Sequence, residues 1–215
     1  MGLISILDFT RSLDIISIIG LPISYAGCLL NCAAVIQKGK ILGLVPQTYI
    51  PNNREINEQR WFTSGDIFKN GNILICGQNV PLNKNLIFNT PSCKFGIELG
   101  EDLWAPIPSS SELSLHGAEI IFNLSATSES AGRHDYLKAL LAQQSARSIS
   151  GYVFASSGFG ESTQDHVFAG KGFIYENGTL LSEAERFSFK EQLIISEIDI
   201  DRLRSERRIN TTYRA

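Results

Sequence analysis

The stretch that decides the fold of this chain reads Gly96-Ile97-Glu98-Leu99-Gly100-Glu101-Asp102-Leu103-Trp104. The apolar residues before Gly100 predict a strand, and the glycine with the acidic residues after it predicts a tight turn. In α/β proteins the loops at such strand ends converge on a crevice, where reactive groups lie. The plainer interpretation is a polar turn whose tryptophan only packs. The residues of this stretch alone leave both interpretations open.

Around this stretch, short apolar strands alternate with fewer amphipathic helices, which predicts a mixed α/β fold of layered type. Single strands are predicted at residues 15–21, 72–76, 86–88, 94–99, 120–124, 151–155 and 193–198. Two β-hairpins are predicted, at 29–45 with its turn at Gly39 and at 167–182 with its turn at Asn177-Gly178. Helices are predicted at 2–12, 111–116, 135–148 and, capped by Asp199, to about residue 208.

The composition excludes several classes of protein. The chain has 215 residues, 43% hydrophobic and 19% charged, with a net charge of −3, as expected for one globular domain over residues 1–215. We expect no nucleic-acid partner, because there is no basic stripe. We expect no membrane partner, because the longest apolar run, residues 15–23, is interrupted and shorter than the roughly 20 residues of a span. No secretion signal is recognised, so a cytoplasmic location is expected.

Other residue types that often mark sites carry little signal here. The four cysteines, Cys28, Cys32, Cys76 and Cys93, lack CxxC spacing, and we expect free and mostly buried thiols. No metal site is expected, because His116, His134 and His166 lack metal-ligand spacing and are interpreted as surface or capping residues. The glycine-rich residues 157–160 are interpreted as a turn rather than a phosphate cradle. The arginines near the C-terminus, Arg202, Arg204, Arg207 and Arg208, are interpreted as a solvated helix face.

The motifs of the chain, taken together, resemble a known family. Residues 98–104 resemble the Glu-Ile-Cys-Glu-Asp-Leu-Trp signature of the glutamine amidase domain of glutamine-dependent NAD synthetase. Residues 45–55 resemble its Val-Pro-Lys-Thr-Tyr-Leu-Pro-Asn-Tyr-Arg-Glu segment, and residues 58–62 its Glu-Lys-Arg-Trp-Phe. Further matches follow in order at 123–126, 160–163 and 176–178.

This resemblance implies a fold and a chemistry. The family belongs to the nitrilase superfamily, whose fold is an αββα four-layer sandwich. Its members use a Glu-Lys-Cys triad. The cysteine attacks the side-chain amide of glutamine, the glutamate is the general base and acid, and the lysine with backbone amides stabilises the oxyanion. No cofactor is implied.

The departures from the family fall on that triad. Gly100 stands at the position of the cysteine and offers no side chain, and Gln47 stands at the position of the lysine as a neutral and weaker donor. The triad glutamate of the family comes from a Phe-Pro-Glu-Leu segment, which this sequence does not contain. We therefore expect a sandwich that lacks its first strand and helix, holds no synthetase domain and is catalytically inactive.

Five other family positions are retained, and they are the predicted substrate contacts: Glu58, Glu101, Trp104, Ser125 and Ser128. The ligand implied is glutamine or another small amide. The alternative for Glu58 is an ion pair with Arg54 or Arg60, and the alternative for Trp104 is a place in the core.

Three functions remain open from the sequence. The first is an inactive homologue of the amidase that keeps a ligand pocket. The second is an active amidase subunit, completed by a synthetase partner chain that supplies the missing groups. The third is a non-enzymatic scaffold for a partner. The resemblance also implies a homo-oligomer, a dimer or larger.

Overall fold

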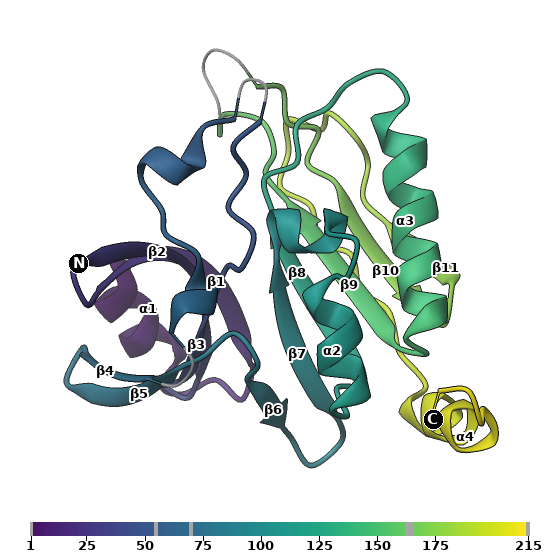
Figure 1. The fold of residues 1–215 in the computed structure, drawn as a ribbon, viewed down its shortest axis with the longest axis horizontal. Coiled ribbons are helices and arrows are strands. Elements are labelled where there is room, and N and C mark those ends of the chain that lie inside the picture. The colour runs from purple at the N-terminus through teal and green to yellow at the C-terminus, as the bar shows by residue number, and fades with distance from the viewer. Residues whose placement is uncertain (1, 54–55, 69–70, 162–165, 214–215) are drawn as a thin grey trace. The chain divides into compact units, whose positions relative to one another are not determined.

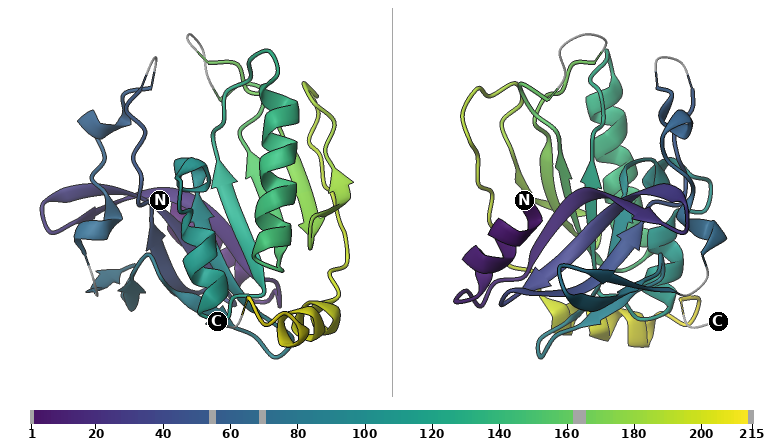
Figure 2. Two further views of the ribbon diagram at one scale, coloured as in Figure 1. Left: turned by 45° about the vertical axis from the view of Figure 1, so that its right-hand side comes forward. Right: turned by 90° about the vertical axis from the view of Figure 1, so that its left-hand side faces the viewer.

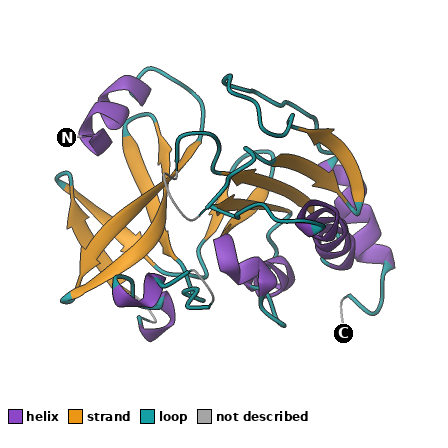
Figure 3. Ribbon diagram, turned by 90° about the horizontal axis from the view of Figure 1, so that it is seen from above, coloured by secondary structure: helices purple, strands orange, loops and turns teal. Residues whose placement is uncertain are grey.

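The computed structural model describes residues 2–53, 56–68, 71–161 and 166–213. They form two compact units, Met1–Leu86 and Ile87–Ala215. Each unit contains one β-sheet with at least one helix, so the predicted α/β class with two sheets is confirmed (Figure 3). The prediction of a single folding domain stays a prediction, as does the absence of a first strand and helix.

The first unit is built on a five-stranded sheet in the order β1-β2-β3-β5-β4. Its elements are α1 (Gly2–Thr10), β1 (Ser17–Tyr25), β2 (Cys28–Gln37), β3 (Lys40–Pro46), β4 (Gly71–Ile75) and β5 (Gln78–Leu82), with 3₁₀ turns at Glu58–Arg60 and Gly65–Ile67. The predicted hairpin of β2 and β3 is confirmed. Its turn residues Lys38 and Gly39 have φ of 50° and 73°, the left-handed pair that a tight hairpin requires. Leu7 of α1 packs into the apolar core of this sheet.

The second unit is built on a six-stranded sheet in the order β11-β10-β9-β8-β7-β6. Its elements are β6 (Ile87–Asn89), β7 (Lys94–Leu99), the 3₁₀ turn η3 (Gly100–Trp104), α2 (Ser109–Leu115), β8 (Ile120–Ser125), α3 (Arg133–Arg147), β9 (Gly151–Ser156), β10 (Gly172–Glu176), β11 (Thr179–Glu183) and α4 (Ile200–Ile209). Strands β7, β8 and β9 are parallel. Helices α2 and α3 lie on the same face of the sheet (Figures 1 and 2). Their Leu113, Leu137 and Leu141 pack there against Tyr152 and Phe154 of β9.

Two strand predictions were wrong. We expected the first strand to end before Pro22, but β1 continues to Tyr25, with Pro22 opposite Asn31. The strand tolerates a proline because β1 is the edge of its sheet and needs no donor on its outer side. Residues 193–198 were predicted as a strand, but they form no strand. Instead, Ile194 and Ile198 lie close against Gly172 and Gly151 of the sheet.

The cysteine prediction holds in part. All four cysteines are free, but only Cys32 is buried, and Cys76 is exposed. Burial raises the pKa of the Cys32 thiol to about 12, which keeps it protonated and inert at neutral pH. No helix within the described ranges is long and apolar enough to cross a bilayer.

Candidate functional site

The carboxyl ends of the three parallel strands meet at one edge of the second unit's sheet. Leu99 lies opposite Leu124, and Ser125 lies opposite Ser156. The turn that begins at Gly100 follows β7 directly. This is the place where parallel sheets of α/β proteins present reactive groups.

The backbone at Gly100 has φ +44°, in the left-handed region that glycine adopts easily. Here the chain passes from a strand into a 3₁₀ turn through a residue in the left-handed region, where most side chains would be strained. A nucleophile is displayed in the same way on the sharp strand-to-helix turns of hydrolases. Because glycine has no side chain, no nucleophile is displayed at this position.

Glu98 is the centre of a buried polar network under α2 and α3. Its Oε1 accepts from the Tyr152 hydroxyl at 2.6 Å and from Asn123 Nδ2 at 3.3 Å, and its Oε2 accepts from the backbone N–H of Ser110. Gln144 Nε2 of α3 donates to Ser110 Oγ at 3.0 Å and extends the network. The network therefore joins β7, β8 and β9 to both helices.

The chemistry of Glu98 follows from this burial. Burial raises the pKa of the Glu98 carboxyl, while the donors from Ser110, Tyr152 and Asn123 oppose that rise. Its side chain is closed off from solvent, with 1% of the residue exposed. Of the three acidic residues in this stretch, Glu98 is thus a structural group and not a candidate acid or base.

Glu101 and Trp104 lie in the turn itself, and both are half-buried. The Trp104 ring stacks on the Tyr136 ring, with 5.5 Å between the two centroids. The guanidinium of Arg133, the first residue of α3, lies 4.6 Å from the centroid of the Trp104 ring. Trp104 is thus fixed between turn and helix, although it is not part of the fully buried core. Its role as a ligand contact stays a prediction.

Ser125 and Ser128 lie where β8 ends and the loop toward α3 begins, and both are half-buried. Ser125 Oγ lies 2.7 Å from Thr127 Oγ1, and the Thr127 N–H donates to Ser156 Oγ at 3.1 Å. Hydroxyl groups from two neighbouring strand ends are therefore linked at this edge. Thr127, which lies between the two serines, is buried.

Gln47 and Glu58 belong to the first unit. The Gln47 side chain is buried; it donates from Nε2 to the Tyr49 carbonyl at 3.0 Å and accepts from Asn31 Nδ2 at 2.8 Å. Its amide is therefore tied into the local backbone, which leaves one N–H for any other acceptor. Glu58 is half-buried in a 3₁₀ turn. Its predicted alternative partner Arg54 lies outside the described residues.

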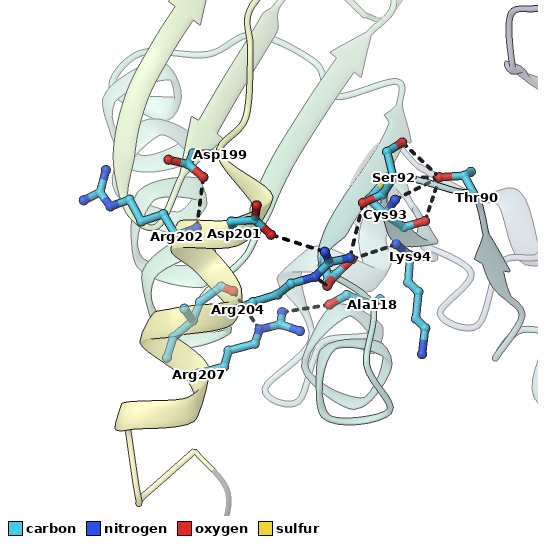
Figure 4. A network of polar contacts seen from close by, with 12 residues as sticks. Thr90, Ser92, Cys93, Lys94, Ala118, Asp199, Asp201, Arg202, Arg204 and Arg207 are labelled. Atoms are coloured by element: carbon cyan, nitrogen blue, oxygen red, sulfur yellow. Dashed lines mark hydrogen bonds and ion pairs between the residues drawn. The ribbon is translucent and has the colours of Figure 1, made fainter.

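Two predictions about charged residues need correction. The solvated helix face predicted for the C-terminal arginines holds in part: Arg202, Arg204 and Arg208 are exposed, but Arg204 and Arg207 also bind the body of the second unit (Figure 4). Arg204 donates to Glu119 at 2.6 Å and to the Ser92 carbonyl at 3.2 Å, and Arg207 donates to the Ala118 carbonyl at 2.7 Å. These contacts could not be predicted from the helix itself, because their acceptors lie far away in the sequence.

His134 was interpreted as a surface or capping residue, but its side chain is 14% exposed and lies 3.3 Å from Glu183. Burial lowers the pKa of His134, and Arg186 lowers it further against the opposing Glu183. Within the described residues no group of three His, Cys, Asp or Glu side chains is placed to hold a metal ion.

A cluster of three charges, two of them buried, was not found from the sequence. Lys171 Nζ lies 3.1 Å from Glu129 Oε2, and Arg186 lies 3.3 Å from the same oxygen. These residues come from three segments far apart in the chain, so no spacing could have indicated them.

Comparison with known proteins identifies the family. The sequence model of the carbon-nitrogen hydrolase family matches residues 3–208. A glutamine-dependent NAD(+) synthetase of Mycobacterium tuberculosis is 37% identical over 203 residues, which cover 92% of this chain and 30% of that protein. One from Aquifex aeolicus is 23% identical over 97% of this chain and 33% of its own length.

Solved structures agree. A glutamine-dependent NAD(+) synthetase from Cytophaga hutchinsonii matches 86% of this chain and 30% of its own, with 25% identity and a TM-score of 0.76. A carbon-nitrogen hydrolase from Helicobacter pylori has the same fold, with a TM-score of 0.77 at 20% identity over 97% of this chain and 70% of its own. The chain spans about a third of the length of the synthetases that it matches. It belongs to the carbon-nitrogen hydrolase family and is homologous to part of the glutamine-dependent NAD(+) synthetases.

Proposed function

We propose that this chain is a catalytically silent homologue of the glutamine-hydrolysing domain, folded as its relatives are and able to bind glutamine or a similar small amide. The observation that carries the proposal is Gly100. It occupies the tight turn after β7, where the motif has its nucleophile, and it supplies no atom that could attack an amide. Without that nucleophile the acyl-enzyme route has no first step.

The second support is Gln47. In the motif this position carries a lysine, whose charge would stabilise an oxyanion more strongly than a neutral amide does. Here the glutamine amide is buried, and one of its N–H groups is used by the Tyr49 carbonyl. Loss of catalytic groups that act as a unit leaves only the slow turnover that binding supplies.

Ammonia release from L-glutamine tests the proposal, measured on the purified chain beside the Gly100→Cys variant and a blank without protein. We expect the wild-type chain not to exceed the blank. Turnover by the wild-type chain that disappears on changing Gln47 or Glu101 would overturn the proposal and favour an active subunit. Turnover by the cysteine variant alone would support a silent domain with an intact pocket. If neither the wild-type chain nor the Gly100→Cys variant releases ammonia, the result supports an inactive domain in which further positions besides 100 have lost their catalytic groups.

Assembly and location belong to the same proposal. We expect a homodimer or larger oligomer, which light scattering behind a sizing column measures directly. A synthetase chain is the expected partner if the protein is a scaffold, and a pull-down from native extract separates the two cases. A cytoplasmic location is supported by four cysteines that are all free.

A further inference from the structure

Glu129 and Lys171 form a buried ion pair with the partly exposed Arg186 beside it, and a buried ion pair is by itself weak evidence for stability. The Lys171 side chain is 0% exposed and the Glu129 side chain 8% exposed. Removing two charges from water costs free energy that their attraction often fails to recover, and apolar residues of similar volume are frequently as stable. We therefore expect the ion pair of Glu129 and Lys171 to serve the positions of the segments that it joins.

The cluster joins three segments without regular structure. Glu129 lies in the loop between β8 and α3, Lys171 directly precedes β10, and Arg186 follows β11. Backbone bonds accompany the charges. The Glu129 N–H donates to the Val167 carbonyl at 2.7 Å, and the Ser156 N–H donates to the Lys171 carbonyl at 2.9 Å. The loop that contains Glu129 is thereby held to residues 167–171 by one backbone hydrogen bond and one ion pair.

The loop that Glu129 anchors is the one that carries the predicted ligand contacts. Ser125 and Ser128 precede Glu129 by four and one positions, and Arg133, which lies over Trp104, opens α3 just after it. Loops without regular structure sample several conformations unless side chains hold them. An anchor next to Ser128 therefore decides how the hydroxyl groups at this strand end are presented.

We propose that Lys171 is a positioning residue: through its buried ion pair with Glu129 it fixes residues 126–132 and so sets the affinity of the strand-end site for its ligand. The part of this inference that concerns the ligand rests on the proposed function. The part that concerns the loop stands by itself. The role of Arg186 is secondary, since its side chain is 37% exposed.

The test compares Lys171→Met with the wild-type chain. Methionine keeps most of the volume of lysine and removes the charge. The matched control is Lys138→Met, because Lys138 pairs with Glu183 at 2.6 Å on the exposed surface of the same unit. Three quantities are measured: amide hydrogen exchange of residues 126–132, the exchange of β8 and β9, and the affinity for L-glutamine.

In Lys171→Met we expect exchange of residues 126–132 to rise at least about tenfold, while β8 and β9 stay protected. Affinity for L-glutamine should fall by a similar factor. The control should change neither. Adding Glu129→Gln to Lys171→Met should cause little further loss, because the two residues act as one unit.

Unchanged exchange of residues 126–132 in Lys171→Met would overturn the inference. So would a rise spread evenly over the whole unit, since that is the result of a purely structural role. If the wild-type chain does not bind L-glutamine, the part of the proposed function that names glutamine as the ligand is contradicted. The exchange measurements then still decide whether Lys171 holds the loop.

Discussion

Glu98 lies in the motif of residues 98–104, yet its contacts belong to the buried core of the second unit. Both of its oxygens accept hydrogen bonds, from the Tyr152 hydroxyl and Asn123 on one side and the Ser110 N–H on the other. A buried acceptor needs donors, and each of these donors in turn needs an acceptor. The residue and its partners are therefore interdependent.

Glu98→Gln is expected to lower the free energy of unfolding by about 1–3 kcal/mol. The amide of glutamine must point its N–H₂ group either at the Ser110 N–H or at the Tyr152 hydroxyl, so one donor loses its acceptor. Urea denaturation at neutral pH measures the change. The exposed Glu112→Gln is the control and should stay within about 0.5 kcal/mol of the wild-type chain. Equal stability of both variants would contradict the role given to Glu98.

Gly100→Ala tests the strain at the turn after β7. A residue with Cβ in the left-handed region costs about 1–2 kcal/mol, so this variant should lose about that much stability. The control is Gly20→Ala, because Gly20 has no positive φ and nothing lies within 4 Å of an added Cβ. It should be neutral or slightly stabilising. A neutral Gly100→Ala would mean that the turn adapts without strain.

Among the elements, α4 depends on contacts at both its start and its side. Asp199 caps it by accepting from the Arg202 N–H at 2.9 Å, as its sequence predicts. Arg204 and Arg207 then fasten the helix to Glu119 and to backbone carbonyls. The cap is a local feature that a sequence reveals, whereas the fastening depends on the sheet.

Asp199→Ala is expected to destabilise the chain by about 0.5–2 kcal/mol, because the first turn of α4 loses the acceptor for one N–H. Asp199→Asn is the matched control, since asparagine caps equally well. Hydrogen exchange of residues 200–204 should rise in the alanine variant and stay low in the asparagine variant. If both variants behave alike, the carboxylate charge and not the cap matters at this position.

On the scale of the whole molecule, the dependence of folding stability on acid pH is set by buried carboxylates. Burial alone would raise the pKa of Glu119 and of Glu129. Arg204 with the Lys94 N–H at Glu119, and Lys171 with Arg186 at Glu129, more than offset this, so the pKa of each carboxyl lies below its usual range. A lowered folded-state pKa contributes stability that is present above the unfolded value and lost as pH falls through the folded one. The contribution of Glu98 to the pH dependence of stability has the opposite sign, because its folded-state pKa is raised.

We therefore expect the chain to lose stability as pH falls below about 4, the unfolded range of glutamate. Glu119→Gln and Glu129→Gln should each be less stable than the wild-type chain at neutral pH. Each should also lose less stability on acidification, because the titrating group is gone. Urea midpoints across this pH range provide the measurement. Parallel curves for the wild-type chain and both variants would exclude these two groups as the source of acid sensitivity.

Local features of this protein were determined by its sequence. Gly39 and Asn177-Gly178 placed the two hairpin turns, and Asp199 placed the start of α4, because each acts on residues within a few positions. The motif around Gly100 likewise indicated the family, because the residues that carry it are consecutive in the sequence.

Only the tertiary structure decided which polar and charged residues distant in the sequence contact one another. Glu98 and Tyr152 are 54 positions apart, and Glu119 and Arg204 are 85 apart. Glu129 and Lys171 likewise come from separate segments. No periodicity connects such pairs, since their contact depends on the order of strands in a sheet and not on spacing along the chain. The sequence therefore showed Gly100 where the motif has its nucleophile, and the fold showed which distant polar residues come together in the second unit.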